Sequence, residues 1–392
     1  MKVAGIVCEY NPMHNGHVYQ IAQTKKSGAT HIVCVMSGNF VQRGDCAYAD
    51  KWIRSDIAIH CGADLVVDLP SAWSCDSAQN FAFGAVSILD SLGIDVLSFG
   101  SETDDIKLLK KCSQIDDEKL SQYISPAIKN GASYPSALYD AVLKVCGEDA
   151  AKIVSSPNST LALEYIKALS KLSSNAQPLA IKRKTAKHDD TSFDGYIVSA
   201  AALRGLDDFS KMKEYVPTYA YDKLSESIEI GFAPARLEYA ERAVLSYLRT
   251  VSREKISECI SDERGLCDRI FKFSKTAESL DELFSAVKTK NVTMAKVRRS
   301  ILRLYLGINS DISVEKPPYI KVLAANKKGL EIIKNAKGNI PIVSKHSDFS
   351  KLSSFAKEVY MQECRATDLY ALFSKKIRAC CLEQTSPVNI FR

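Results

Sequence analysis

Residues 3–17 read Val-Ala-Gly-Ile-Val-Cys-Glu-Tyr-Asn-Pro-Met-His-Asn-Gly-His. The first six residues form a continuous apolar run, which predicts a strand buried on both faces. A helix is predicted from Gly16 to Lys26, so the polar residues between form the first strand–helix turn. Because a helix start presents free N–H groups and a partial positive charge, this turn favours a phosphate-bearing ligand.

The same alternation of strand and helix continues through the first hundred residues. Further strands are predicted at 31–36, 65–69 and 96–99, with helices between them. Continuous apolar strands separated by helices indicate a parallel sheet covered on both faces, so we predict a Rossmann-like α/β domain. In such sheets ligands lie beyond the carboxyl ends of the strands. Beyond residue 217 the pattern is mostly helical, with a lone strand expected at 319–324.

The length of 392 residues suits two domains, which we place at residues 1–210 and 211–392. The first carries 20 Lys and Arg against 24 Asp and Glu, and the second 32 against 22. Net charges of −4 and +10 follow, and the basic half suggests a polyanionic partner. The alternative, that these charges only keep a helical domain in solution, stays open.

Composition also argues against several classes of protein. No apolar run approaches the roughly 18 residues that span a bilayer, and the apolar N-terminus is too short for a signal peptide. None of the twelve cysteines forms a pair with the two-residue gap of a zinc knuckle. We therefore expect a cytoplasmic protein without membrane contact or structural metal, whose cysteines are mostly buried thiols.

The two histidines of the opening motif carry the clearest chemistry. His14 and His17 lie three residues apart, so both project from one side of the helix start. There they can donate hydrogen bonds to an α-phosphate, while Gly16 leaves room for a base or ribose. Alternatively, the pair only satisfies backbone groups at the helix start. A zinc site would require a third ligand, which the sequence does not indicate.

This segment resembles the His-x-Gly-His signature of the HIGH nucleotidylyltransferase superfamily, which implies adenylyl transfer. The superfamily also has a late Ser-Ser-Thr-x-x-Arg motif, and here Ser-Ala-Ala-Ala-Leu-Arg occupies residues 199–204. The resemblance implies that Ser199 and Arg204 contact phosphates. Two hydroxyl-bearing residues of that motif are alanine in this chain, so most of its side-chain hydroxyls are missing.

A closer resemblance covers nearly the whole chain. Seven segments in order are similar to the bacterial tRNA(Met) cytidine acetate ligase family: Glu-Tyr-Asn-Pro-x-His-Asn-Gly-His at 9–17, Met-Ser-Gly-Asn-Phe-Val-Gln-Arg-Gly at 36–44, Phe-Gly-Ser-Glu at 99–102, Ser-Pro-Asn at 156–158, Lys-Arg at 182–183, Pro-Tyr-Ile-Lys-Val-Leu at 318–323 and Arg-Ala-Thr-Asp-Leu-Tyr at 365–370. The resemblance implies a nucleotidyltransferase-like ATP and acetate domain, followed by a helical domain that binds tRNA.

It also implies the reaction and the residues that bind ATP. Acetate is activated with ATP as acetyl-adenylate, and the acetyl group moves to N4 of the wobble cytidine of elongator tRNA(Met). The implied ATP contacts are Val7, Cys8, Glu9, Tyr10, Asn11, Pro12, Met13, His14, Asn15, Gly16, His17, Val18, Tyr19, Gln20, Gly100, Asn158 and Arg183. Met13 and Asp45 depart from the family pattern, which has Phe and Glu there.

Two further sets of residues are candidates. Arg43 lies in a glycine-bounded loop, residues 37–44, where it is either a catalytic cation or a solvated one. A run of cations without any acid between residues 284 and 310 favours contacts to tRNA phosphates over a solvated face. Its members are Lys288, Lys290, Lys296, Arg298, Arg299 and Arg303.

For the mechanism, we expect His14 and His17 to stabilise the transition state, with Mg²⁺ on the leaving pyrophosphate. Two rival functions stay open. An acetate-activating ligase or adenylyltransferase acting on a small molecule or acyl carrier would share the histidine site without using the basic half. A non-enzymatic RNA-binding protein would keep ATP as a structural ligand only. The sequence does not indicate the oligomeric state or the proton acceptor.

Overall fold

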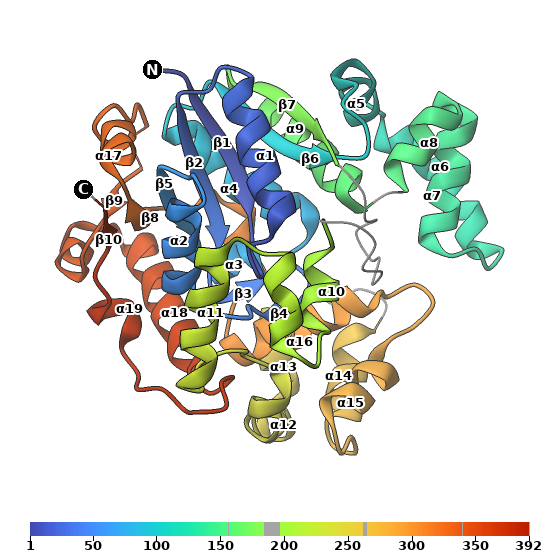
Figure 1. Cartoon of the computed structure of the whole chain (residues 1–392). Coiled ribbons are helices and arrows are strands. Elements are labelled where there is room, and N and C mark those ends of the chain that lie inside the picture. The colour runs from blue at the N-terminus through green and yellow to red at the C-terminus, as the bar shows by residue number, and fades with distance from the viewer. Residues whose placement is uncertain (156, 184–196, 262–264, 339, 392) are drawn as a thin grey trace.

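A mostly parallel β-sheet forms the centre of the computed structural model, which describes residues 1–155, 157–183, 197–261, 265–338 and 340–391 (Figure 1). Its strand order is β10-β8-β5-β2-β1-β6-β7, with β9 paired to β8. The five strands of the N-terminal part are parallel neighbours: β1 (Val3–Cys8), β2 (His31–Ser37), β5 (Leu65–Leu69), β6 (Val96–Ser101) and β7 (Gln177–Lys182). The predicted Rossmann-like α/β fold is confirmed.

The strands are buried because helices cover both faces of the sheet. Helices α1 (Asn15–Lys26) and α2 (Lys51–His60) lie on one face, where Ile21 and Ile57 pack with Ile32. Helices α4 (Ala78–Ser91) and α9 (Pro157–Lys171) cover the opposite face. Alternate residues of each strand therefore enter two different cores, and this explains why the strands read as continuous apolar runs.

The strand predicted at residues 319–324 is not a lone strand. It is β8 (Ile320–Ala325), which pairs antiparallel with β5 and parallel with β9 (Ile342–Val343) and β10 (Asn389–Ile390). Its burial on every residue is the physical reason, because an unpaired buried strand would leave backbone groups unsatisfied. The sheet thus draws strands from both sides of residue 210, and the domain boundary there stays a prediction.

The remaining elements surround this sheet (Figure 1). A short hairpin of β3 (Phe40–Val41) and β4 (Asp45–Cys46) follows β2. The other helices are α3 (Ser71–Ser74), α5 (Ile106–Ser113), α6 (Asp117–Lys129), α7 (Tyr134–Cys146), α8 (Glu148–Val154), α10 (Ala200–Arg204), α11 (Thr218–Glu229), α12 (Glu241–Thr250), α13 (Arg253–Cys259), α14 (Leu266–Phe273), α15 (Leu280–Val287), α16 (Met294–Leu306), α17 (Lys327–Lys334), α18 (Ser354–Tyr370) and α19 (Leu382–Thr385), with 3-10 turns η1 (Phe209–Glu214), η2 (Leu237–Ala240), η3 (Ile312–Val314) and η4 (His346–Lys351).

A buried charge cluster joins the C-terminal helices to the sheet. The Lys51 Nζ atom lies 2.6 Å from Asp68, 3.1 Å from Glu363 and 2.8 Å from Glu383. Burial by itself lowers the pKa of Lys51, but these carboxylates raise it well above its usual range. Lys51 is therefore charged, and it connects α2 and β5 to α18 and α19.

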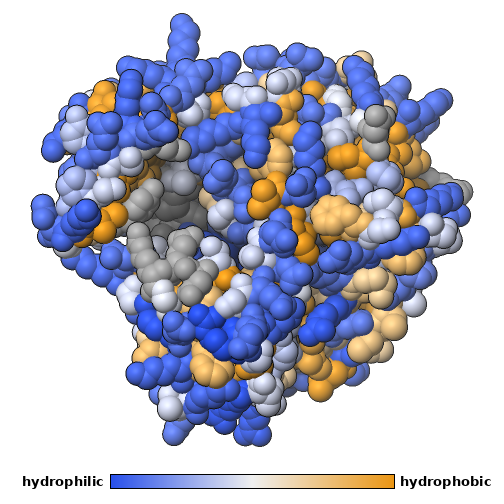
Figure 2. Space-filling view, turned by 180° about the vertical axis from the view of Figure 1, so that it is seen from behind, coloured by the Kyte–Doolittle hydropathy of each residue, from blue (hydrophilic) through white to orange (hydrophobic). Residues whose placement is uncertain are grey.

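The cysteines, the helix lengths and the surface can be compared with what the sequence predicts. All twelve cysteines are free, and most of them are buried. In the described part of the chain, no helix is both long and apolar enough to cross a bilayer. Hydrophilic residues cover most of the face shown in Figure 2, with hydrophobic residues scattered or in small groups.

Candidate functional site

The turn between β1 and α1 is held by backbone hydrogen bonds that the side chains of the two motif histidines accept. Tyr10 turns the chain with a φ of 45°, a conformation that costs energy for a residue with a side chain. His14 then caps α1, because its Nδ1 accepts a hydrogen bond from the Gly16 amide at 3.1 Å. The Nδ1 atom of His17 accepts one in return from the His14 amide at 3.2 Å.

These bonds determine which histidine nitrogens face a ligand. The two imidazole rings lie on one side of the helix start, as the three-residue spacing predicts, and they are stacked with centroids 3.7 Å apart and planes 27° apart. Since each Nδ1 atom accepts a backbone N–H, each neutral ring carries its proton on Nε2. Each ring therefore offers an Nε2–H donor at the positive end of a helix.

Burial keeps both rings neutral at pH 7. It lowers the pKa of His14 to about 3, with Arg183 and Arg204 contributing to the same direction. It also lowers the pKa of His17 well below its usual value, helped by His14 and Arg183. The pair therefore offers a ligand fixed hydrogen-bond donors and no titrating charge.

Gly16 is required for this geometry. A Cβ atom at this position would lie 2.8 Å from Cε1 of His14 and 3.1 Å from a methyl of Ile197. Such contacts would force the capping imidazole to move. The glycine thus makes room for the His14 ring itself.

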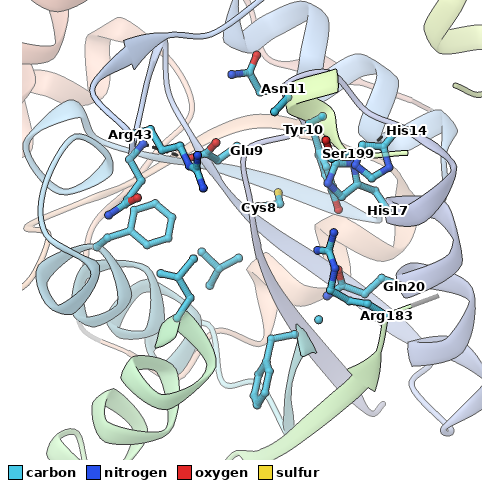
Figure 3. A pocket seen from close by; sticks show the side chains of 18 of the residues that line it. Cys8, Glu9, Tyr10, Asn11, His14, His17, Gln20, Arg43, Arg183 and Ser199 are labelled. Carbon is cyan, nitrogen blue, oxygen red and sulfur yellow. Dashed lines mark hydrogen bonds between the residues drawn. The ribbon is translucent and has the colours of Figure 1, made fainter. Parts of the chain in front are cut away.

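The two histidines line a cavity at the carboxyl ends of β1 and β6 (Figure 3). The chain runs from β1 outward through β2 and β5, and then returns to the other side of β1 with β6. The cavity therefore occupies the topological switch point, where α/β sheets bind ligands. It is lined by Val7, Cys8, Glu9, Tyr10, Asn11, His14, His17, Gln20, Gln42, Arg43, Phe81, Phe99, Gly100, Leu161, Tyr165, Arg183, Ser199, Ala200, Ala201 and Arg204.

Most of the residues predicted from sequence meet at this cavity. Gly16 and Tyr19 line an adjoining pocket, which shares His14, His17 and Gln20 with it. Pro12, Met13, Asn15 and Val18 are not among the described residues that line either one. Met13 is buried in the core, and the Asn15 amide donates to the Tyr215 carbonyl, so their ATP contacts stay predictions.

Three arginines reach the cavity from different elements. Arg183 follows β7, and its amide donates to the Ser101 carbonyl at 3.0 Å. Arg204 ends α10, and its Nη1 donates to the Asn11 carbonyl at 2.7 Å. Arg43 comes from the β3–β4 hairpin. Arg183 and Arg204 act on the histidines, while Arg43 lies across the cavity beside Glu9 (Figure 3), and such positive charges suit the phosphates of a nucleotide.

Ser199 and Asn158 are the two remaining predicted ATP contacts. Ser199 caps α10, with its Oγ accepting a hydrogen bond from the Ala202 amide at 3.1 Å, and it lines the cavity. The side chain of Asn158, like Ser156 of the same motif, lies outside the described residues.

Sequence reasoning missed the wall of the cavity away from the histidines. Gln42, Phe81, Phe99, Leu161 and Tyr165 line it, from four different elements or loops. Phe99 had a signal in the family-like segment 99–102, and Gln42 had one in the segment 36–44. The Gln42 amide donates to Glu9 Oε1 at 3.0 Å. Phe81, Leu161 and Tyr165 are indistinguishable from core positions in sequence.

The cations of the predicted basic run differ in their exposure, and some of them already pair with groups of the protein. Lys288 and Lys290 are exposed, while Lys296 and Arg298 are half-buried on α16. Arg303 is only 6% exposed, so we leave it out of any surface for RNA.

Arg303 donates to the Ala72 carbonyl at 2.6 Å and pairs with Asp76 at 3.2 Å. The run has no acid of its own, but tertiary structure supplies acids from elsewhere: Arg298 also lies 3.8 Å from Asp45. Among the described residues, no three His, Cys, Asp or Glu side chains lie together so that they could hold a metal ion.

The sequence is similar to that of known proteins over nearly its whole length. The sequence model of the HIGH nucleotidyl transferase family matches residues 1–385. A tRNA(Met) cytidine acetate ligase of Caldicellulosiruptor saccharolyticus is 35% identical, over 96% of this chain and 95% of its own. One of Acetivibrio thermocellus is 36% identical, over 96% of both chains.

Solved structures show the same fold over the full length. The crystal structure of apo Thermotoga maritima TmcAL superposes with a TM-score of 0.93 at 30% identity, covering 100% of both chains. The structure of that protein bound with alpha-thio ATP gives a TM-score of 0.91 at 28% identity, again over 100% of both chains.

Proposed function

This chain belongs to the tRNA(Met) cytidine acetate ligase family of HIGH nucleotidyl transferases, and we propose that it performs the ligase reaction of that family. It uses ATP to convert acetate to acetyl-adenylate, and transfers the acetyl group to N4 of the wobble cytidine of elongator tRNA(Met). The reaction takes place in the cytoplasm, where the tRNA is.

The observation that carries this proposal is the pair of neutral Nε2–H donors of His14 and His17. They lie at the start of α1, in a cavity that also receives Arg183 and Arg204. The full-length relative bound with alpha-thio ATP supports ATP as the ligand of this cavity.

In the first step a carboxylate oxygen of acetate attacks the α-phosphorus, and the bond to the bridging oxygen of pyrophosphate breaks. Acetate is ionised at pH 7, so this step needs no general base. Negative charge moves onto the phosphate oxygens, where preorganised donors stabilise a transition state most. His14 and His17 supply these donors, while Arg183 and Arg204 attract the leaving pyrophosphate. Mg²⁺ that arrives with ATP belongs to the substrate in this scheme.

In the second step the cytosine amine attacks the acetyl carbonyl, and AMP leaves. The target base has to leave any stack to reach the cavity, as an unpaired anticodon base can do. Lys288, Lys290 and Lys296 provide positive charge for the RNA backbone on the side of α16.

The test is to incubate the protein with ATP, Mg²⁺, labelled acetate and elongator tRNA(Met), and then to digest the tRNA to nucleosides. We expect label on a cytidine that is heavier by one acetyl group, and only when ATP is present. Label on a small molecule or acyl carrier instead would favour the alternative ligase. Acetyl-CoA replacing both ATP and acetate, or label on the 3′-terminal ribose, would contradict the proposed mechanism.

A further inference from the structure

A second cavity adjoins the nucleotide cavity on the other side of Arg204, which lines both. The β3–β4 hairpin also separates the two, because Arg43 faces the first and Asp45 the second. Helices α15 and α16 contribute Phe284 and Arg298 to its wall. Any ligand in this second cavity would therefore lie next to the adenylation site.

The second cavity combines groups that recognise a nucleobase. It presents guanidinium groups, carboxylates and the aromatic side chains of Tyr48 and Phe284. The Arg298 guanidinium lies over the Phe284 ring, 5.2 Å from its centroid. The Arg298 Nε atom is buried without a hydrogen-bond partner among the described residues. Leaving a buried donor unsatisfied costs about 1–3 kcal/mol, so a turn of this side chain that brings Nε to an acceptor oxygen of a ligand would be favourable.

Asp45 provides an acceptor in the same cavity. Its Oδ1 atom accepts a hydrogen bond from the Cys46 amide at 2.8 Å, which fixes the carboxylate. Its Oδ2 atom lies 3.8 Å from Arg298 Nη1, beyond hydrogen-bond distance. Burial raises the pKa of Asp45 despite Arg298 and Arg204 nearby, which makes this carboxylate a better base than an exposed one.

Resting on the proposed function, we propose that the second cavity receives the target cytosine and that Asp45 accepts the proton lost by its amine. Cytosine offers carbonyl and ring-nitrogen acceptors beside an exocyclic amino donor. The arginines match the first two groups, the carboxylate matches the third, and the Arg298 guanidinium over Phe284 offers a flat group for stacking. A phosphate would match this cavity poorly, because carboxylates line it as well.

The transfer step requires only acetyl-adenylate, the cytosine amine, Asp45 and water. The N4 lone pair forms a bond to the acetyl carbonyl carbon, and the bond from that carbon to the adenylate oxygen breaks. AMP leaves with the electron pair, while the N4 proton passes to Oδ2 of Asp45 and then to water. A base assists here because the cytosine amine is a weak nucleophile until it loses its proton.

The first experiment compares the unmodified protein with Asp45→Asn in single-turnover acetyl transfer to tRNA. We expect transfer to fall by about 100-fold or more, the usual range for losing a general base. Acetate-dependent exchange of labelled pyrophosphate into ATP requires no cytidine, and we expect it to continue. Asp45→Glu should restore much of the transfer. Asp222→Asn, on the exposed side of α11, removes the same charge elsewhere and is the matched control.

Normal transfer by Asp45→Asn would overturn the proposal, as would equal loss of exchange and transfer. If the unmodified protein makes no acetylcytidine at all, the proposed function fails and this inference fails with it. If the unmodified protein forms acetylcytidine and the Asp45→Asn variant transfers the acetyl group at the same rate, the proposed function stands and only this inference fails.

The second experiment locates the base without a variant, and so does not depend on any variant folding. A tRNA with 5-iodocytidine at the target position is irradiated in complex with the unmodified protein, and the cross-linked peptide is identified by mass spectrometry. Cross-linking to Tyr48 or Phe284 is expected. Cross-linking to Phe81, Phe99 or Tyr165 would place the base in the nucleotide cavity and overturn the proposal.

Discussion

The guanidinium of Arg299 donates a hydrogen bond to the carbonyl oxygen of Gln42 at 3.2 Å. The amide of Gln42 in turn donates to the Glu9 carboxylate, which lines the nucleotide cavity. Gly44 of the β3–β4 hairpin packs directly against helix α16, since a Cβ at this position would lie 2.3 Å from the Arg299 amide nitrogen. Helix α16 thus supports the β3–β4 hairpin that carries Arg43.

We therefore expect Arg299→Ala to impair adenylation itself. Loss of this bond lets the hairpin shift, and misplacement by about 1 Å can cost on the order of 100-fold in rate. The measurement is acetate-dependent pyrophosphate exchange in the absence of tRNA. Arg253→Ala removes an arginine from α13, away from both cavities, and serves as the control. Exchange at the normal rate would show that the hairpin holds its position without Arg299.

Exposed lysines should behave in the opposite way. Replacing Lys288 and Lys290 together by alanine removes two positive charges before α16 without touching the nucleotide cavity. We expect weaker tRNA binding and a salt dependence flatter by about two units of slope. Exchange without tRNA should not change. An unchanged salt slope would place the RNA on another face of the molecule.

His14→Ala and His17→Ala should each lower acetyl-adenylate formation at least about tenfold, because loss of one preorganised donor typically costs roughly 2.7–4 kcal/mol. His14→Ala also removes a helix cap, so His14→Asn is the sharper variant: it keeps a capping side chain but loses the Nε2–H donor. Thermal melting controls for folding, and His60→Ala controls for histidine loss elsewhere. Two active alanine variants with unchanged Tm would refute the site assignment.

Stability should fall as pH falls below the usual histidine range. Burial lowers the pKa of His14 to about 3, whereas in the unfolded chain it titrates near 6.5. Between these values the unfolded state binds a proton that the folded state does not, so folding is weakened as pH drops from 6.5 toward 3. His14→Asn should reduce the loss of Tm between pH 7 and pH 4.5. An equal pH dependence in both proteins would show that His14 does not contribute to it.

Lys51→Met should destabilise the protein by about 3–5 kcal/mol, because it leaves buried carboxylates without their shared cation. Urea unfolding measures this change. Lys152→Met removes a lysine from an exposed pair with Glu148 and should have little effect. Equal stability of the two variants would mean that other contacts hold α18 and α19 against the sheet.

Local patterns were sufficient for the parallel sheet and for the histidine turn. The bounds of β1 and β5 agree with the residues predicted, because continuous apolar strands bounded by polar turns are visible within a few residues. His14, Gly16 and His17 were recognised for the same reason: one short segment holds the donors, the cap and the space that they require.

The amino-acid sequence by itself therefore determined the α/β fold, the family resemblance and the histidine half of the site. Only the tertiary structure decided that β8 joins the sheet, that Lys51 meets Glu363 and Glu383, and that Arg299 supports Gln42. Partners such as Arg299 and Gln42 are separated by 257 residues, so no local spacing records their contact. Whether a cation faces solvent, a phosphate or a buried acid depends on which distant segment packs against it.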